Sequence, residues 1–131
     1  LREKYGWVYG VECSYTQYQD TGIAAISIGC DKDNLDRCIR EVEKQLHKLR
    51  TVPLSDKKLK SAKKQLLGQI AISSDNGETQ CLSMGKGLMD YGKVLDDATT
   101  QKLVEQIKAE DIRRIACSVF GPEKLSTLIY I

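Results

Sequence analysis

The stretch Trp7-Val8-Tyr9-Gly10-Val11-Glu12-Cys13-Ser14-Tyr15 decides the fold class, because its large side chains alternate with smaller or polar ones. A period of two is typical of a β-strand. The next residues, Gln19-Asp20-Thr21-Gly22, are a turn cluster. A second strand is expected from Ile23 to Cys30, with Ala24, Ile26, Ile28 and Cys30 on one face. Two strands across a short polar turn predict an antiparallel hairpin.

The rest of the chain is predicted to be mainly helical. From Leu35 to Arg50 an apolar stripe recurs at helical spacing, formed by Leu35, Cys38, Ile39, Val42, Leu46 and Leu49, and Pro53 ends that pattern. Further helices are expected after a cap at Ser55, after a capping-box restart at Asp75 and after Asp96 or Asp97. A last helix from Glu110 to Phe120 is expected to bury Ile112, Ile115 and Val119. Leu125–Ile131 is predicted as a closing strand. The expected class is α+β, with four or five helices on one face of a mainly antiparallel sheet.

The composition is that of a soluble globular chain. It has 131 residues, 41% hydrophobic and 29% charged, and this length can hold a core without disulfides or metals. No apolar run approaches the ~20 residues of a membrane span. Twenty basic against 18 acidic residues give a net charge of +2. Neither nucleic acid nor a membrane surface is therefore expected as a partner.

The cysteines indicate a reducing compartment, and hence a cytoplasmic location. There are five, an odd number, and none of them form a C-x-x-C pair. This favours free thiols over a disulfide framework or a zinc knuckle. The chain begins at Leu1 instead of Met. We therefore expect residues 1–131 to be one partial domain, cut from a longer protein.

No catalytic constellation emerges from the residues taken one by one. His47, the lone histidine, is expected to be a solvated side chain on a polar helix face. The lysines between positions 57 and 64 have the spacing of such a face. Gly85-Lys86-Gly87 lacks the other features of a phosphate loop. The hairpin aromatics are expected to pack or to bind peptide, and Cys13 and Cys30 to be buried thiols.

The opening segment resembles an element of a known family. Leu1-Arg2-Glu3-Lys4-Tyr5-Gly6-Trp7-Val8-Tyr9 looks like the L-R-E-K-x-G-h-x-Y element of the pitrilysin and mitochondrial-processing-peptidase family, zinc peptidases with an inverted H-x-x-E-H motif. Weaker matches follow in order along essentially the whole chain: Tyr18-x-Asp20-Thr21-Gly22, Asp31-Lys32-Asp33-Asn34-Leu35, Leu54-Ser55 with Lys60, Lys63, Leu66 and Gly68, and Ile107 to Ile112. The chain resembles the end of the second homologous half, in the shorter bacterial type that carries both halves on one chain.

The resemblance implies a catalytic role for two residues. In active members of the family an arginine and a tyrosine of this element reach across to the zinc site of the first half, and the matching positions are Arg2 and Tyr9. A guanidinium suits a peptide carbonyl or carboxylate, and a tyrosine hydroxyl suits a developing oxyanion. Zinc would be the cofactor of the intact protein. It would be held by an N-terminal half that closes with this chain around an unfolded peptide substrate.

The 131 residues themselves contain no zinc motif. Neither H-x-x-E-H nor a downstream glutamate ligand is present, so we expect this piece alone to bind no catalytic zinc and to cleave nothing.

Two other interpretations stay open. In a non-catalytic scaffold or partner subunit of the same family, Arg2 would only cap a helix and Tyr9 would be one more cross-strand aromatic. An autonomous binding module fits less well with a sheet this thin. In any of these cases an unpaired strand edge invites pairing between copies, so a homo-oligomer is also expected.

Overall fold

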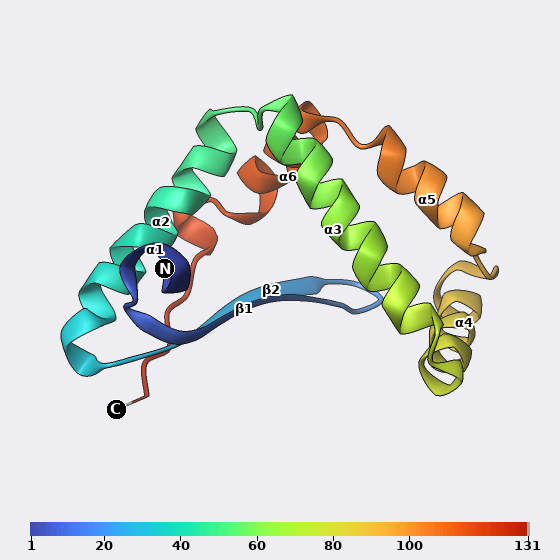
Figure 1. Cartoon of the computed structure of the whole chain (residues 1–131), viewed down its shortest axis with the longest axis horizontal. Coiled ribbons are helices and arrows are strands. Elements are labelled where there is room, and N and C mark those ends of the chain that lie inside the picture. The colour runs from blue at the N-terminus through green and yellow to red at the C-terminus, as the bar shows by residue number, and fades with distance from the viewer. Residues whose placement is uncertain (131) are drawn as a thin grey trace. The chain divides into compact units, whose positions relative to one another are not determined.

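The computed structural model describes residues 1–130, with the backbone alone at Lys4 (Figure 1). The elements in order are α1 (Arg2–Tyr5), β1 (Val8–Gln17), β2 (Gly22–Cys30), η1 (Lys32–Asn34), α2 (Leu35–Thr51), α3 (Asp56–Ser74), α4 (Gly77–Tyr91), α5 (Asp97–Gln106), α6 (Ala109–Val119) and η2 (Pro122–Lys124). The chain forms two compact units. One comprises Leu1–Val52 with Arg113–Ile131, and the other comprises Pro53–Ile112. The α+β class expected from the sequence is confirmed.

The predicted hairpin is present in the first unit (Figure 1). β1 and β2 pair antiparallel, with Gln17 opposite Gly22 at the turn and Val8 opposite Cys30 at the far end. The backbone N–H of Tyr18 donates to the carbonyl of Thr21 over 2.9 Å and closes the turn. The ring of Tyr15 covers Gly22. A Cβ at position 22 would lie 2.6 Å from the Tyr15 hydroxyl oxygen, so the ring occupies the space that a side chain would need.

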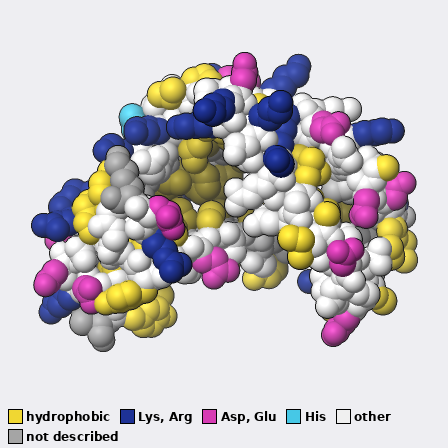
Figure 2. All heavy atoms as spheres, in the orientation of Figure 1, with side chains coloured by type: hydrophobic (Ala, Val, Ile, Leu, Met, Phe, Trp, Pro, Cys, Tyr) yellow, Lys and Arg dark blue, Asp and Glu magenta, His cyan; other side chains and the backbone are white. Residues whose placement is uncertain are grey.

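The predicted inner face of β2 is partly covered, whereas most of β1 is exposed to solvent. The four residues predicted to share a face of β2 are all half-buried: Ala24, Ile26, Ile28 and Cys30. In β1 only Val8 is buried. Large hydrophobic side chains such as Tyr9, Val11 and Tyr15 are exposed, and Figure 2 shows hydrophobic side chains in yellow on the surface.

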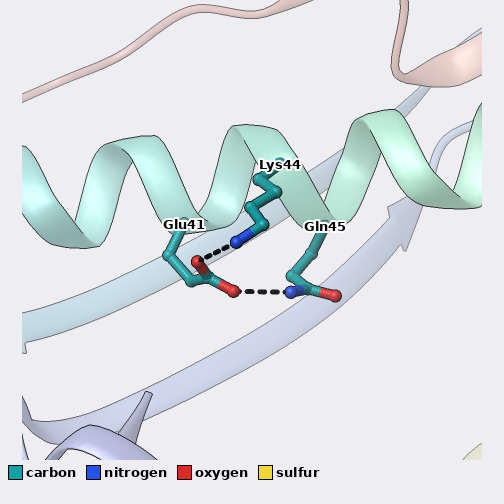
Figure 3. A network of polar contacts seen from close by, with 3 residues as sticks. All are labelled: Glu41, Lys44 and Gln45. Carbon is teal, nitrogen blue, oxygen red and sulfur yellow. Dashed lines mark hydrogen bonds and ion pairs between the residues drawn. The ribbon is translucent and has the colours of Figure 1, made fainter.

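The helix α2 supplies the main apolar stripe of the first unit. Cys38 and Leu46 are buried, and the other predicted stripe residues, Leu35, Ile39, Val42 and Leu49, are half-buried. The Cys117 thiol of α6 lies 3.5 Å from the Arg50 carbonyl oxygen and donates to it. The opposite face of α2 is polar. There Glu41 accepts hydrogen bonds from Lys44 at 3.4 Å and from Gln45 at 2.6 Å (Figure 3).

The second unit is helical, and its boundaries follow the sequence signals. α3 packs against both α4 and α5, and the ammonium of Lys63 donates to the Glu105 carbonyl over 2.7 Å. Gly92, with φ of 68°, ends α4 as a left-handed residue, which glycine adopts without steric cost. No helix in residues 1–130 has both the length and the apolar composition needed to cross a bilayer.

Three local predictions were wrong. Residues 125–130 of the predicted closing strand Leu125–Ile131 pair with neither β1 nor β2, and residue 131 lies outside the described part. Extended backbone becomes a strand only when a neighbouring strand takes up its hydrogen bonds. In α6, Ile115 and Val119 are exposed, and the small Ala116 is the buried residue. The cap of α4 is Asn76 and not Asp75.

Candidate functional site

Tyr9 lies at an irregularity in the hairpin. From Gly10 opposite Gly29 to Gln17 opposite Gly22 the register is constant, and it shifts between Val8 and Gly10. Tyr9 is therefore the extra residue of a β-bulge. A bulge redirects a side chain out of the regular alternation of its strand, and bulges are frequent next to active sites. The simple alternation predicted for Trp7 to Tyr15 is broken at the residue that the resemblance singles out.

The hydroxyl of Tyr9 is held by an acidic residue at the end of the other strand. Tyr9 is 69% exposed, and its hydroxyl donates a short hydrogen bond to the carboxylate of Asp31. This hydrogen bond is the main reason that the pKa of Tyr9 is raised above its ordinary value, with desolvation and the negative charge of Asp31 adding to it. A phenol that donates to a carboxylate resists losing its proton, so Tyr9 is a hydrogen-bond donor at neutral pH.

Arg2 is carried by the short helix α1, which leads directly into β1. Gly6 ends this helix with φ of 64°, and its N–H donates to the Arg2 carbonyl over 2.9 Å. The ring of Tyr5 stacks on Trp7 with centroids 4.2 Å apart. The guanidinium of Arg37 in α2 lies 6.0 Å from the Trp7 ring, within range of a cation–π contact. Stacking therefore fixes α1 to the start of the hairpin.

Arg2 and Tyr9 are both exposed at this end of the first unit. Within residues 1–130 no hydrogen bond or ion pair joins their side chains, and the Tyr9 hydroxyl is bound to Asp31 instead. Two groups that must both contact a substrate need exposure and not mutual contact. The arrangement offers a positively charged fork and, seven residues later, a neutral hydroxyl whose single proton is donated to Asp31, so Tyr9 must leave Asp31 before it can donate to an external oxygen atom.

The histidine, the lysines and the Gly85–Gly87 segment lie as the simplest interpretations predicted, whereas neither predicted buried thiol is fully buried, since Cys30 is half-buried. His47 is exposed on α2, and Gly85-Lys86-Gly87 lies inside α4 and not in a loop. The lysines of α3 are exposed, apart from the half-buried Lys63. Cys13 is also exposed and lies opposite Ile26, so its prediction as a buried thiol was wrong.

A metal does not fit the residues present. Within residues 1–130, no three His, Cys, Asp or Glu side chains are grouped so that they could hold a metal ion. The side chains described in residues 1–130 therefore offer no zinc site.

The residue that sequence reasoning missed is Asp31, the partner of Tyr9. It was interpreted only as part of a helix entry. The signal that could have found it is the predicted turn: counting back from both sides of Gln19–Gly22 places the residues around position 30 opposite the residues around position 9. The count stays one residue uncertain, because a bulge cannot be seen from alternation alone.

The chain is similar in sequence to a known peptidase domain and to proteins named as peptidases. The model of the peptidase M16 inactive domain matches residues 1–66. A protein of Rickettsia felis named an uncharacterized zinc protease is 25% identical over 129 residues, which is 98% of this chain and 31% of that protein. The beta subunit of the mitochondrial-processing peptidase of Blastocladiella emersonii is 29% identical over 102 residues, 77% of this chain and 22% of the subunit.

Solved structures share the fold at low sequence identity. A chain of complex III2 from Candida albicans has a TM-score of 0.80 at 19% identity, over 89% of this chain and 28% of its own. The periplasmic protease PqqL from Escherichia coli has a TM-score of 0.65 at 14% identity, over 89% of this chain and 13% of its own. The chain thus spans less than a third of the length of each of these relatives and neighbours.

Proposed function

The chain belongs to the peptidase M16 family, as a C-terminal part with the inactive domain, and from this membership we propose that it is the substrate-binding part of a zinc-dependent endopeptidase. Its relatives are named zinc proteases, while no metal group is present among the described residues. Zinc would accordingly be held by an N-terminal half, either on the same chain or on a partner subunit. The two halves would close around an unfolded peptide.

The observation that carries this proposal is the Tyr9 hydroxyl. It is exposed, it is displaced from the strand's alternation by a bulge, and Asp31 keeps it protonated. When its proton turns from Asp31 to the substrate, a neutral hydroxyl donor of this kind can stabilise the oxygen that becomes negative as a peptide carbonyl is attacked. Because that oxygen is charged only in the transition state, the hydrogen bond would act on kcat more than on substrate binding.

Arg2 would bind the peptide rather than take part in the chemical step. Its exposed guanidinium can form paired hydrogen bonds with a backbone carbonyl or a carboxylate of the substrate. The stacking of Tyr5 on Trp7 fixes the helix that carries it. A substitution at Arg2 is therefore expected to weaken substrate binding, and so to raise KM.

The test begins with the coding sequence upstream of Leu1, which we expect to contain an H-x-x-E-H helix and a distant glutamate. The zinc-loaded protein with both halves is then assayed on an unfolded peptide. We expect Tyr9→Phe to lower kcat about 10²–10³-fold with little change in KM, the cost of removing one oxyanion donor. Tyr15→Phe is the matched control, because Tyr15 is 67% exposed on the same strand, and it should keep full activity.

Two results would contradict the proposal. Equal activity of Tyr9→Phe and Tyr15→Phe would remove Tyr9 from the reaction. A wild-type assembly that binds a zinc-loaded half without cleaving peptide would favour a non-catalytic partner subunit. The chain of residues 1–131 alone should retain no stoichiometric zinc after dialysis. Retention would contradict the proposal that the N-terminal half holds the zinc.

A further inference from the structure

Two cysteines from different elements lie side by side in the first unit. Cys30 is the last residue of β2, and Cys38 follows eight residues later in the first turns of α2. Both line one pocket of about 410 Å³, together with apolar side chains such as Ile28 and Ile39. The Cys30 thiol is also close enough to Cys38 to contribute, after burial, to the raised pKa of the Cys38 thiol. The two thiols therefore lie at one pocket, on either side of the turn η1 that joins strand and helix.

The two thiols differ in how easily a reagent can reach them. Cys38 is 1% exposed, whereas Cys30 is half-buried. Burial, followed by the hydrogen bond with Cys30, raises the pKa of the Cys38 thiol. The thiolate is the form that attacks a disulfide, and the raised pKa makes Cys38 the poorer first nucleophile. Cys30 is also the more exposed of the two, so a small reagent reaches it first. Cys38 then lies in place as the second, resolving thiol.

We propose that Cys30 and Cys38 are a modification site for small disulfides and close reversibly into an intrachain disulfide. The Cys30 thiolate attacks one sulfur of the small disulfide, whose S–S bond breaks and releases one thiolate. Cys38 loses its proton to solvent and attacks the Cys30 sulfur, which breaks the mixed disulfide and releases the second thiolate. Two protein thiols are oxidised, and one small disulfide is reduced to two thiols.

The bond would form next to the candidate site. Cys30 directly precedes Asp31, and it lies opposite Val8, which directly precedes Tyr9. Closing the disulfide would tie the end of β2 to α2 and so fix the junction that carries Asp31. The inference does not depend on the proposed peptidase function, because it is tested by thiol chemistry alone.

The experiment equilibrates the chain with mixtures of oxidised and reduced glutathione, quenches with acid, alkylates the free thiols and maps the products by mass spectrometry. Trypsin cuts after Lys32 and Arg37, so the two cysteines end on different peptides. Cys13 shares the peptide of Cys30, and the Cys13→Ser variant makes the assignment unambiguous. We expect joint loss of both thiols, a Cys30–Cys38 cross-link, and full recovery on reduction.

A second variant tests the order of the two steps. In Cys38→Ser the resolving thiol is missing, so Cys30 should accumulate as a mixed disulfide with one glutathione. If Cys38→Ser does not fold, the Cys13→Ser chain still decides the question. Cys30 and Cys38 that remain fully alkylated throughout the series would overturn the proposal. So would adducts confined to the exposed Cys81 and Cys117.

Discussion

Tyr9 shows how one extra residue can change what a side chain does. In a regular strand Tyr9 would take its place in the alternation with Trp7 and Val11, but the register shift between Val8 and Gly10 removes it from that pattern. The hydroxyl then meets Asp31, which lies just beyond the end of the partner strand. The polar contact at this end of the hairpin is therefore a product of the bulge.

We predict that Asp31→Asn lowers the pKa of Tyr9 toward that of an ordinary tyrosine, because it removes both the carboxylate acceptor and its negative charge. The measurement is a spectrophotometric titration of phenolate, with Tyr9 identified as the difference between the chain and Tyr9→Phe. Asp33→Asn is the control, since Asp33 is a neighbouring exposed acid in η1. A Tyr9 transition that Asp31→Asn leaves unmoved would contradict the assignment.

The sign of the pH dependence follows from the direction of the shift. The pKa of Tyr9 is higher in the folded chain than in the unfolded one, so the hydrogen bond to Asp31 stabilises the fold fully below the ordinary tyrosine value of about 10. That contribution is lost as the pH rises through the folded pKa. It is unaffected at neutral pH, where the phenol is protonated in both states.

At the level of single residues the sequence predicted the buried positions of α2 better than side-chain contacts. Cys38 and Leu46 were expected in a buried stripe and are buried. Arg2 and Tyr9 were selected through a family resemblance, and their roles stay predictions. Asp31 was missed, because its contact with Tyr9 depends on register across the hairpin, and register is not a local property of either strand.

The helices end where capping residues allow them to. Asn76 accepts a hydrogen bond from the Thr79 N–H at 3.0 Å, and Asp96 accepts one from the Thr99 N–H at 2.7 Å. The hydrogen bond with Thr99 lowers the pKa of Asp96. The cap at Asp96 therefore contributes stability above the ordinary aspartate pKa of about 3.9, and this contribution is lost as the pH falls through the lower folded value.

We predict that Asn76→Ala destabilises the chain by about 1 kcal/mol, because it leaves an N–H of the first turn of α4 without its acceptor. Asp75→Ala is the matched control. Asp75 directly precedes the cap and was the residue that the capping-box pattern selected, yet it lies outside the hydrogen bond. Urea unfolding followed by circular dichroism measures both. A larger loss of unfolding free energy in Asp75→Ala than in Asn76→Ala would show that Asp75 is the capping residue.

Helices were predicted more reliably than strands, for a physical reason. The start of α2, the break at Pro53 and the end of α4 at Gly92 depend on residues within one turn of the boundary. The closing strand depended on hydrogen bonds to a distant neighbour, which alternation cannot supply, and it was not found in residues 125–130. The division into two units also depends on long-range contacts and left no signal in the sequence.

At the scale of the whole molecule, much apolar surface is left uncovered. The sheet of the described residues has two strands, so each has an edge that no third strand pairs with there. Exposed residues of β1 include Val11 at 51% and Tyr15 at 67%. A free edge beside exposed apolar side chains favours pairing with another chain. In the proposed assembly the N-terminal half would compete for such surfaces.

We therefore predict that the chain of residues 1–131 associates with itself when it is alone. Light scattering over a range of concentrations should give a mass that rises above that of the monomer. Val11→Lys should lower this mass, because it places a charge beside the free edge of β1. Gln65→Lys adds the same charge at an exposed position of α3 and should leave the association unchanged. A constant monomer mass at every concentration would exclude the prediction.

The ring of Tyr15 over Gly22 has a consequence for how the hairpin can change over generations. A methyl group at position 22 would meet the ring, so an alanine there displaces the tyrosine and uncovers the last strand pair before the turn. A smaller residue at position 15 makes room for that methyl group. Without a substitution at position 22, however, it exposes Gly22 to solvent. The two positions are energetically coupled. Because the Tyr15 side chain is 67% exposed, its ring can turn toward solvent, so the hairpin accommodates a larger residue at position 22 by moving the ring and not the backbone.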